Sequence, residues 1–490
     1  MSIIYFHSMN TRSLLLLFVV LSSLGCTNGK PDEEPPKLII SKQSVVIHDI
    51  PALAKPFAFE KTMNKIVATA GGTATNSTEM LKSMIDSFAE SSFTHPLSGK
   101  VVEVKARPLE SALDPKNLLD PASADGMIPV GLFNRFDLAP ADGSDCGEYR
   151  IVYAKKSGGR TDRMTMIFEA RVPNPNPGEG LKGCAPITDF WAERSKDANA
   201  AQSIVELEKL YYHGISQVDP IVKADNYGLK RGQIRVNLFM TPNPNDIQWA
   251  LREFLVGLDS NGRAILKPEP IDDSPIASLF RAASASSDFS EEERKNFHQS
   301  FLGQSLCNLV NPDRINKKAS AADIINGISV GSDPKFNDFE SISQTDNDNP
   351  AFDTDPLLLN QVQERLAALS DLSGVSPEQL MNRAGTMTCG GCHQFSAGSD
   401  LGNNATWPAS LGFVHIDEKG DLSPLLNDLF IPQRIKIAQQ FKDNRTAFHQ
   451  VKALCPGEAS ILESVATPNV TKLREQGSID PRVYAPARTH

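Results

Sequence analysis

The sequence reads Thr388-Cys389-Gly390-Gly391-Cys392-His393-Gln394 near its C-terminal end. Two cysteines stand three positions apart, and a histidine directly follows the second. Neither glycine between them carries a Cβ atom, so the backbone can turn tightly there. With 7 Cys and 9 His among 490 residues, composition alone gives about 0.002 chance occurrences of this pattern. The pattern is therefore specific enough to indicate chemistry.

The residues from Cys389 to His393 resemble the haem-attachment motif of bacterial c-type cytochromes. In that family each thiol adds to one vinyl group of the porphyrin, and the adjacent imidazole binds the iron. The resemblance implies one covalent haem c on Cys389 and Cys392, with His393 as the proximal iron ligand. Zinc is the rival metal. However, adjacent Cys392 and His393 are poor joint zinc ligands, and the chain has no second closely spaced cysteine pair.

The sixth iron ligand is left open by the sequence. Many small cytochromes c use a methionine downstream of the motif, and this chain has none after Met387. We favour His415 as the distal ligand, because it follows Phe413 on an alternating apolar stretch. The other candidates are His449, Met381, Met387 and His298. Two histidine ligands favour a low-potential electron carrier, whereas an open position permits reaction with peroxide, oxygen or nitric oxide.

Other side chains near the motif are candidates to surround a haem. Its apolar walls are expected from Phe395, Trp407, Phe413 and Phe430. Its propionates are expected to meet Arg383, Arg434 or the indole N–H of Trp407. Each of these side chains is equally typical of an ordinary core or surface.

The N-terminal residues predict export and lipid attachment. Arg12 precedes an apolar run at 14–21, which is too short to be a stable membrane anchor. The ending Leu24-Gly25-Cys26 resembles a bacterial lipobox, although Ser23 stands where that pattern prefers leucine. We expect a signal peptide at 1–25, lipid on Cys26 and a charged tether at 26–37. The chain is then expected in the bacterial cell envelope, at either face of the outer membrane. An ordinary secretory signal is the alternative.

The four remaining cysteines suit an oxidising compartment. They allow two disulfides in three pairings. We favour Cys146–Cys184 and Cys307–Cys455, because the first two bracket a β segment and the last two lie in helical surroundings. One or more of them could instead stay free and buried. The formal charge of −10, without a long basic run, argues against nucleic acid as a partner.

Hydrophobic patterning predicts an α+β protein. The β-rich N-terminal domain is expected at 38–270, with strands at 149–154, 164–170 and 233–240 and a hairpin at 254–266. A helical segment and acidic linker follow at 271–355. An α-helical cytochrome c-like haem domain is expected at 356–470, before a C-terminal tail at 471–490. Ser290 and Ser376 are expected to cap helices.

These features together predict an exported monohaem c-type cytochrome-like protein. It would transfer electrons to a redox partner protein in the cell envelope rather than act as an enzyme. Two alternatives remain. One is a haem enzyme or gas sensor with an open sixth iron position, and the other is a surface binding lipoprotein with a structural haem. Residues 38–350 contain no nucleophile elbow, zinc-protease motif or phosphate loop, so the sequence predicts no role for them.

Overall fold

The computed structural model describes residues 37–445, except 74, 95–100, 158–160, 229–230, 244–248, 270, 272–276, 283–289, 316–319, 329–353 and 369–374. The chain divides into two compact units, Met1–Leu38 and Ile39–His490, and the second holds the fold described below. The predicted signal peptide, Cys26, most of the tether, His449, Cys455 and the C-terminal tail lie outside the described residues.

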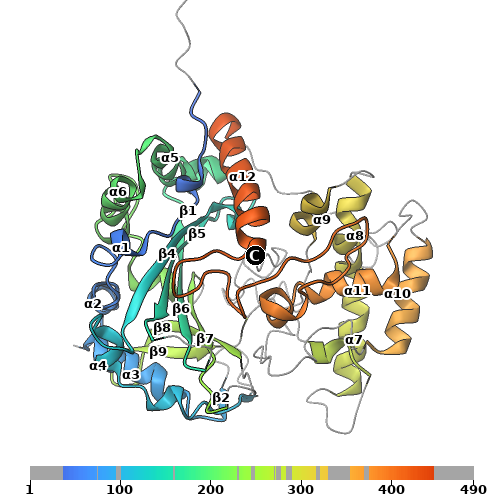
Figure 1. The fold of residues 1–490 in the computed structure, drawn as a ribbon, viewed down its shortest axis with the longest axis horizontal. Helices are drawn as coiled ribbons and strands as arrows, with labels where there is room; N and C mark the ends of the chain where they lie inside the picture. Colours follow the sequence, from blue (N-terminus) through green and yellow to red (C-terminus); the bar gives the residue numbers. More distant parts are fainter. Residues whose placement is uncertain are drawn as a thin grey trace, which may run out of the picture. The chain divides into compact units, whose positions relative to one another are not determined.

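A seven-stranded sheet forms the centre of the second unit (Figure 1). Its strands are β1 Val46–Ile47, β4 Met127–Arg135, β5 Asp145–Lys155, β6 Met164–Pro173, β7 Gln233–Leu238, β8 Ala250–Leu258 and β9 Ala264–Glu269. They lie in the order β1-β4-β5-β6-β7-β8-β9, and every neighbouring pair is antiparallel. A separate pair joins β2 Ser92–Thr94 to β3 Val101–Glu103.

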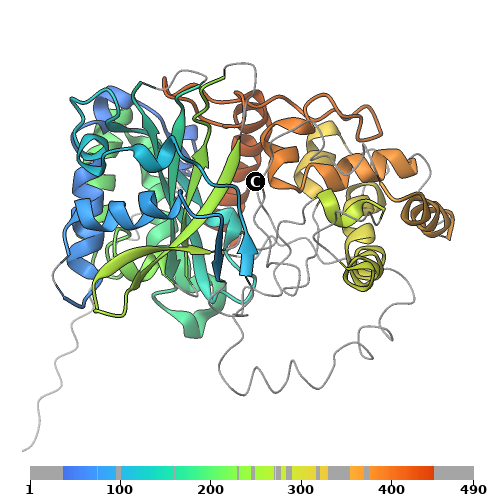
Figure 2. The same ribbon diagram turned by 90° about the horizontal axis from the view of Figure 1, so that it is seen from below.

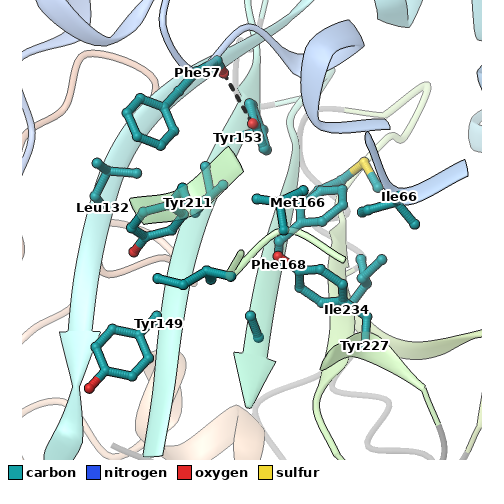
Figure 3. Close-up of a cluster of buried hydrophobic side chains, with 14 of the residues drawn as sticks. Phe57, Ile66, Leu132, Tyr149, Tyr153, Met166, Phe168, Tyr211, Tyr227 and Ile234 are labelled. Atoms are coloured by element: carbon teal, nitrogen blue, oxygen red, sulfur yellow. Dashed lines mark hydrogen bonds between the residues drawn. The ribbon is translucent and has the colours of Figure 1, made fainter. Parts of the chain in front are cut away.

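Helices from the first half of the chain cover one face of this sheet (Figures 1 and 2). They are α1 Ile50–Leu53, α2 Phe59–Thr69, α3 Ser77–Ser87, α4 Pro115–Leu119, α5 Ala185–Glu193 and α6 Ala200–Tyr212. Because side chains alternate between the faces of a strand, Tyr153 and Phe168 point into this helix-covered core (Figure 3). The Tyr153 hydroxyl is not left unpaired, since it donates to the Phe57 carbonyl at 3.0 Å.

After β9 the named elements of the described chain are all helical. They include α7 Glu291–Ser300, α8 Leu306–Ile315, α9 Ala321–Gly327, α10 Pro356–Ala368, α11 Pro377–Gly385 and α12 Ile431–Asn444. π-Helical turns occur at Phe301–Ser305, Gly391–Phe395 and Leu425–Phe430, and 3-10 segments at Lys42–Ser44, Glu110–Ala112, Phe136–Leu138, Pro177–Cys184, Arg194–Lys196, Ala224–Tyr227 and Ala277–Phe280. Residues of these helices share a hydrophobic cluster with Val130 and Val152 of the sheet. The other face of the sheet is therefore covered as well.

The α+β prediction is confirmed in its coarse form, as a mixed fold with a seven-stranded antiparallel sheet. The predicted strands correspond to β5, β6 and β7, and the predicted hairpin to β8 and β9. Ser290 and Ser376 both cap helices through a capping box, with Glu293 and Gln379 respectively. Helices α5 and α6 were not predicted. The domain boundaries and the cytochrome c-like character of 356–470 stay predictions.

One predicted disulfide is confirmed and the other stays a prediction. Cys146 on β5 is bonded to Cys184, with the Cα atoms 5.4 Å apart. Cys307 is buried and disulfide-bonded, while its expected partner Cys455 lies outside the described residues. Across the part of the chain that is described, no helix is long and apolar enough to cross a membrane.

Candidate functional site

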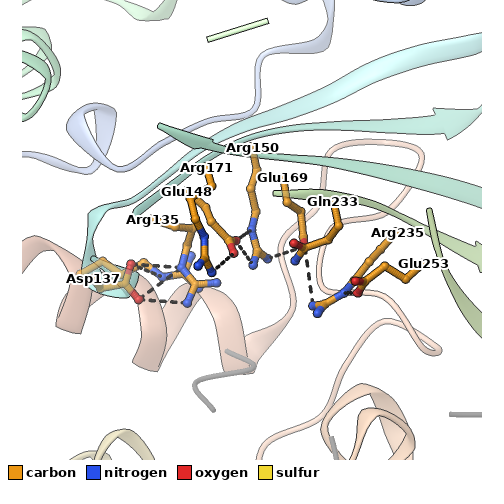
Figure 4. A network of polar contacts seen from close by, with 10 residues as sticks. Arg135, Asp137, Glu148, Arg150, Glu169, Arg171, Gln233, Arg235 and Glu253 are labelled. Carbon is orange, nitrogen blue, oxygen red and sulfur yellow. Dashed lines mark hydrogen bonds and ion pairs between the residues drawn. The ribbon is translucent and has the colours of Figure 1, made fainter. Parts of the chain in front are cut away.

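The second face of the sheet carries buried charges at its centre. Side chains alternate along a strand, so the residues between those that face the helix-covered core point to this opposite face. Here these positions hold ionic side chains, drawn in Figure 4. They are Arg135 on β4, Glu148 and Arg150 on β5, Glu169 and Arg171 on β6, Arg235 on β7 and Glu253 on β8. We call this set the charged face. Glu169 is only 1% exposed, so the charged face is not a solvated surface.

Strand register places opposite charges on the charged face beside one another. Arg150 is the direct partner of Glu169 across β5 and β6, and Arg235 is the partner of Glu253 across β7 and β8. The Arg150 guanidinium lies 2.6 Å from Glu148 and 3.1 Å from Glu169. Arg235 Nε donates to Glu253 at 3.0 Å. Such cross-strand pairs compensate charge that would otherwise be costly to bury.

The arginines hold Glu148 in its ionised form. Burial alone would raise the pKa of this carboxyl group, because a charge is poorly solvated in the interior. The positive charges of the neighbouring arginines, Arg150 foremost and then Arg171, instead lower its pKa to about 2. The charged face is therefore a set of mutually dependent ions.

The Cys389–His393 motif follows α11 directly. Residues Gly391–Phe395 form a π-helical turn, and the Thr388 hydroxyl bridges it to the end of α11 by donating to Gly385 O at 2.8 Å and accepting from Gly391 N at 2.9 Å. A Cβ atom on Gly391 would lie 1.8 Å from Gly385 O. The glycine is therefore required by a close backbone approach. Cys389 and Cys392 are both buried, and neither is in a disulfide.

The His393 ring is fixed in one tautomer. Its Nδ1 lies 2.8 Å from the Phe413 carbonyl oxygen. Since a carbonyl can only accept a hydrogen bond, Nδ1 carries the proton and a neutral ring keeps its lone pair on Nε2. Burial lowers the pKa of His393 to about 4, so the ring is neutral near pH 7. A neutral imidazole with one nitrogen oriented by a backbone carbonyl has the state of a metal ligand.

Phe413 adopts a backbone conformation that a large residue rarely takes. Its φ is +63°, in the left-handed region that costs L-residues roughly 1–2 kcal/mol. The loop around it is held to the sheet by Arg163, which donates to Leu411 O at 2.9 Å and Gly412 O at 2.7 Å. Backbone strain of this kind is typical of functional positions. Here it accompanies the hydrogen bond that orients His393.

A chain of contacts connects His393 to the sheet. Trp249, which is fully buried, stacks on the imidazole with ring centroids 5.2 Å apart. Its indole N–H donates to Asn237 Oδ1 at 3.0 Å, and the Asn237 amide donates to Thr165 at 2.9 Å. Strands β6 and β7 thereby contribute to the position of a ring that belongs to a segment more than 150 residues later in the chain.

The motif and the charged face line one cavity, which is partly open to solvent. Cys389, Cys392, His393 and His415 line it together with four arginines and one glutamate: Arg135, Arg150, Arg235, Arg434 and Glu169. The remaining lining is largely apolar and includes Val152, Ile167, Leu251 and Phe430. The walls thus combine thiols, imidazoles, apolar side chains and an excess of positive charge.

His415 lies beside the motif. The ring centroids of His393 and His415 are 5.1 Å apart. His415 Nε2 is 3.5 Å from Cys392 Sγ, and its Nδ1 is 3.1 Å from the Ser423 hydroxyl. Among the other described candidates for the sixth ligand, Met381, Met387 and His298 do not line the cavity. His298 instead contacts the Leu279 carbonyl oxygen through Nε2 at 2.9 Å.

The predicted haem walls and propionate partners divide into two groups. Phe430 and Arg434 line the cavity, whereas Phe395, Trp407, Phe413 and Arg383 do not. Arg383 is buried and donates to the carbonyls of Leu401 and Leu309. The arginines of the sheet were missed. Charged or polar residues at alternate positions in 148–150, 169–171 and 233–235 were the available signal, because they form a period-two pattern opposite the apolar residues.

Comparisons with family models, curated proteins and solved structures find no match. Within the described residues, no group of three or more His, Cys, Asp and Glu side chains is arranged to hold a metal ion. A haem iron needs only one or two protein ligands, since the porphyrin supplies the others.

Proposed function

We propose that this chain is an exported c-type haem protein that carries electrons in the bacterial cell envelope. One haem c is bonded to Cys389 and Cys392, and His393 Nε2 is its proximal iron ligand. The observation that carries the proposal is the shared cavity: both thiols line it together with a neutral imidazole whose Nδ1 is held by a backbone carbonyl. The haem, when bound, supplies a one-electron iron couple.

The residues that line the cavity fit such a group in their chemistry. The cavity's apolar lining suits a porphyrin, while its arginines suit the negative charge of propionates. Trp249 and the Phe413 carbonyl hold the imidazole, which limits its rotation. Neither cysteine is in a disulfide with another residue.

His415 is the proposed sixth ligand. Its place in the wall of the same cavity as His393 supports this role. Two histidines favour a low-potential carrier whose iron does not need to bind substrate. Export, lipid on Cys26 and an envelope redox partner belong to the same proposal, and they rest on the N-terminal sequence and on the Cys146–Cys184 disulfide, which suits an oxidising compartment.

The test is covalent haem on the exported protein. The full chain is produced in a bacterial host with a cytochrome c maturation system, and the purified protein is separated by denaturing electrophoresis and stained for haem. We expect a stained band for the wild-type chain and none for a Cys389→Ser/Cys392→Ser variant. An exported, folded wild-type chain without covalent haem would refute the proposal. Carbon monoxide that alters the ferrous spectrum would favour the open-site enzyme or sensor instead.

A further inference from the structure

Among the described residues, one guanidinium in the cavity wall has no anionic partner closer than 3.9 Å. Arg434 on α12 is 7% exposed. Within the described part of the chain it forms one ion pair, with Asp137 at 3.9 Å, and its guanidinium lies near the Phe430 ring. That separation is long for a charge-assisted hydrogen bond, which is typically about 2.7–2.9 Å. The charge of Arg434 is therefore poorly compensated by the residues that the structure describes.

The carboxylate beside Arg434 is already engaged. Asp137 makes a two-pronged contact with Arg135, whose Nε and Nη2 donate to it at 3.0 and 2.9 Å. Arg135 is 2% exposed, and it also lines the cavity. Two buried guanidinium groups thus share one aspartate at this point. Arg150 and Glu148 are the next charges, and they largely offset each other through their own pair.

Burial makes this arrangement costly without a ligand. Removal from water lowers the pKa of Arg434, and the charge of Arg135 lowers it further. Arginine nevertheless stays protonated in proteins, so a bound anion would stabilise the buried charge of Arg434. A carboxylate suits it best, because its two oxygens match the planar fork of a guanidinium.

We propose that Arg434 and Arg135 form a carboxylate-binding subsite in the wall of the cavity. Two sources could supply the carboxylate. One is a propionate of the haem, which rests on the proposed function above. The other is a free small organic acid that enters the cavity. In both cases the N-terminal sheet, through Arg135, becomes part of the binding site.

The first experiment uses the haem-free chain, either the Cys389→Ser/Cys392→Ser variant or the wild-type chain if it proves to carry no haem. Acetate is the probe, and its affinity is measured from the rise in melting temperature relative to chloride at equal ionic strength. Arg434→Gln should weaken acetate binding at least tenfold. Lys436→Gln is the matched control, because it removes one positive charge from an exposed position on the same helix. It should bind acetate like the parent.

The second experiment uses the haem-loaded chain and distinguishes the sources. If a propionate occupies the subsite, acetate will not stabilise the loaded protein. Arg434→Gln will then shift the equilibrium about tenfold toward oxidised haem, a fall of about 59 mV for a one-electron couple, because a nearby positive charge is lost. If acetate still stabilises the loaded protein, the subsite takes a free acid.

Two results would overturn the proposal. One is equal acetate binding by Arg434→Gln, Lys436→Gln and the parent. The other applies if the haem-free variant does not fold. It is a haem-loaded Arg434→Gln protein whose reduction potential and response to acetate equal those of Lys436→Gln. Absence of haem from the exported wild-type chain would refute the proposed function alone, since acetate binding by that chain would still support the subsite.

Discussion

Replacement of Glu148 by glutamine tests whether the charged face is held together by its arginines. The substitution keeps the shape of the side chain and removes its charge. The pKa of Glu148 is lowered from 4.5 to about 2 in the fold. At about 1.4 kcal/mol for each pH unit, this shift corresponds to about 3 kcal/mol of stability at pH 7. The Glu148→Gln variant should therefore lose about 3 kcal/mol in its free energy of unfolding at pH 7.

The loss should also depend on pH in a specific direction. A carboxyl group whose folded pKa is depressed stabilises the protein fully above its unfolded pKa, here 4.5. This contribution disappears as the pH falls from about 4.5 toward 2. At pH 3 only about 1 kcal/mol should separate the parent from the variant. Urea unfolding followed by tryptophan fluorescence at pH 7 and pH 3 measures both differences.

Glu206→Gln serves as the control. Glu206 pairs with Lys209 at 2.7 Å on α6, but its side chain is 37% exposed, so its loss should cost less than about 1 kcal/mol. The reasoning about the charged face is refuted if Glu148→Gln resembles Glu206→Gln at pH 7. It is equally refuted if the difference between parent and Glu148→Gln stays constant from pH 7 to pH 3.

Three further predictions concern the motif, the disulfide and the distal ligand. Gly391→Ala should reduce haem incorporation severalfold in the haem-stain assay, because the added Cβ would meet Gly385 O. The control is Gly178→Ala, whose Cβ would meet nothing within 4 Å and which should incorporate haem normally. Equal incorporation by the two variants would contradict the close approach. Cys146→Ala/Cys184→Ala should lower the free energy of unfolding by about 4 kcal/mol, since the bond closes a sequence separation of 38 residues; an unchanged urea midpoint would count against it. His415→Ala should convert the haem spectrum from low spin to high spin, while His298→Ala should not; a low-spin His415→Ala protein would exclude His415 as the distal ligand.

The sequence predicted those features of the fold that depend on local patterns. The capping boxes at Ser290 and Ser376 involve residues three positions apart, so their geometry follows from the helix start itself. Strands β5 and β6 were recognisable from apolar residues such as Tyr149 and Phe168. The Cys146–Cys184 bond followed from the position of both cysteines around one β segment.

The charged face could not be predicted in the same way. Arg150 and Glu169 alternate with apolar neighbours, and alternation usually describes a strand with one face in water. Arg150 and Glu169 are buried by residues 414–434, which line the same cavity. These residues lie about 250 positions later in the chain. Only the tertiary structure brings these segments together. The same limit applies to Arg434, whose relation to Asp137 and Arg135 is not encoded in any local pattern.

The most direct test of the proposed haem site is iron-edge anomalous diffraction from crystals of the exported, purified chain. It locates iron and distinguishes it from zinc in one measurement. We predict a single iron peak in the cavity between the motif and the charged face, at coordination distance from His393 Nε2. An absence of iron, an iron peak elsewhere in the molecule or a zinc peak at Cys389 and Cys392 would contradict the account.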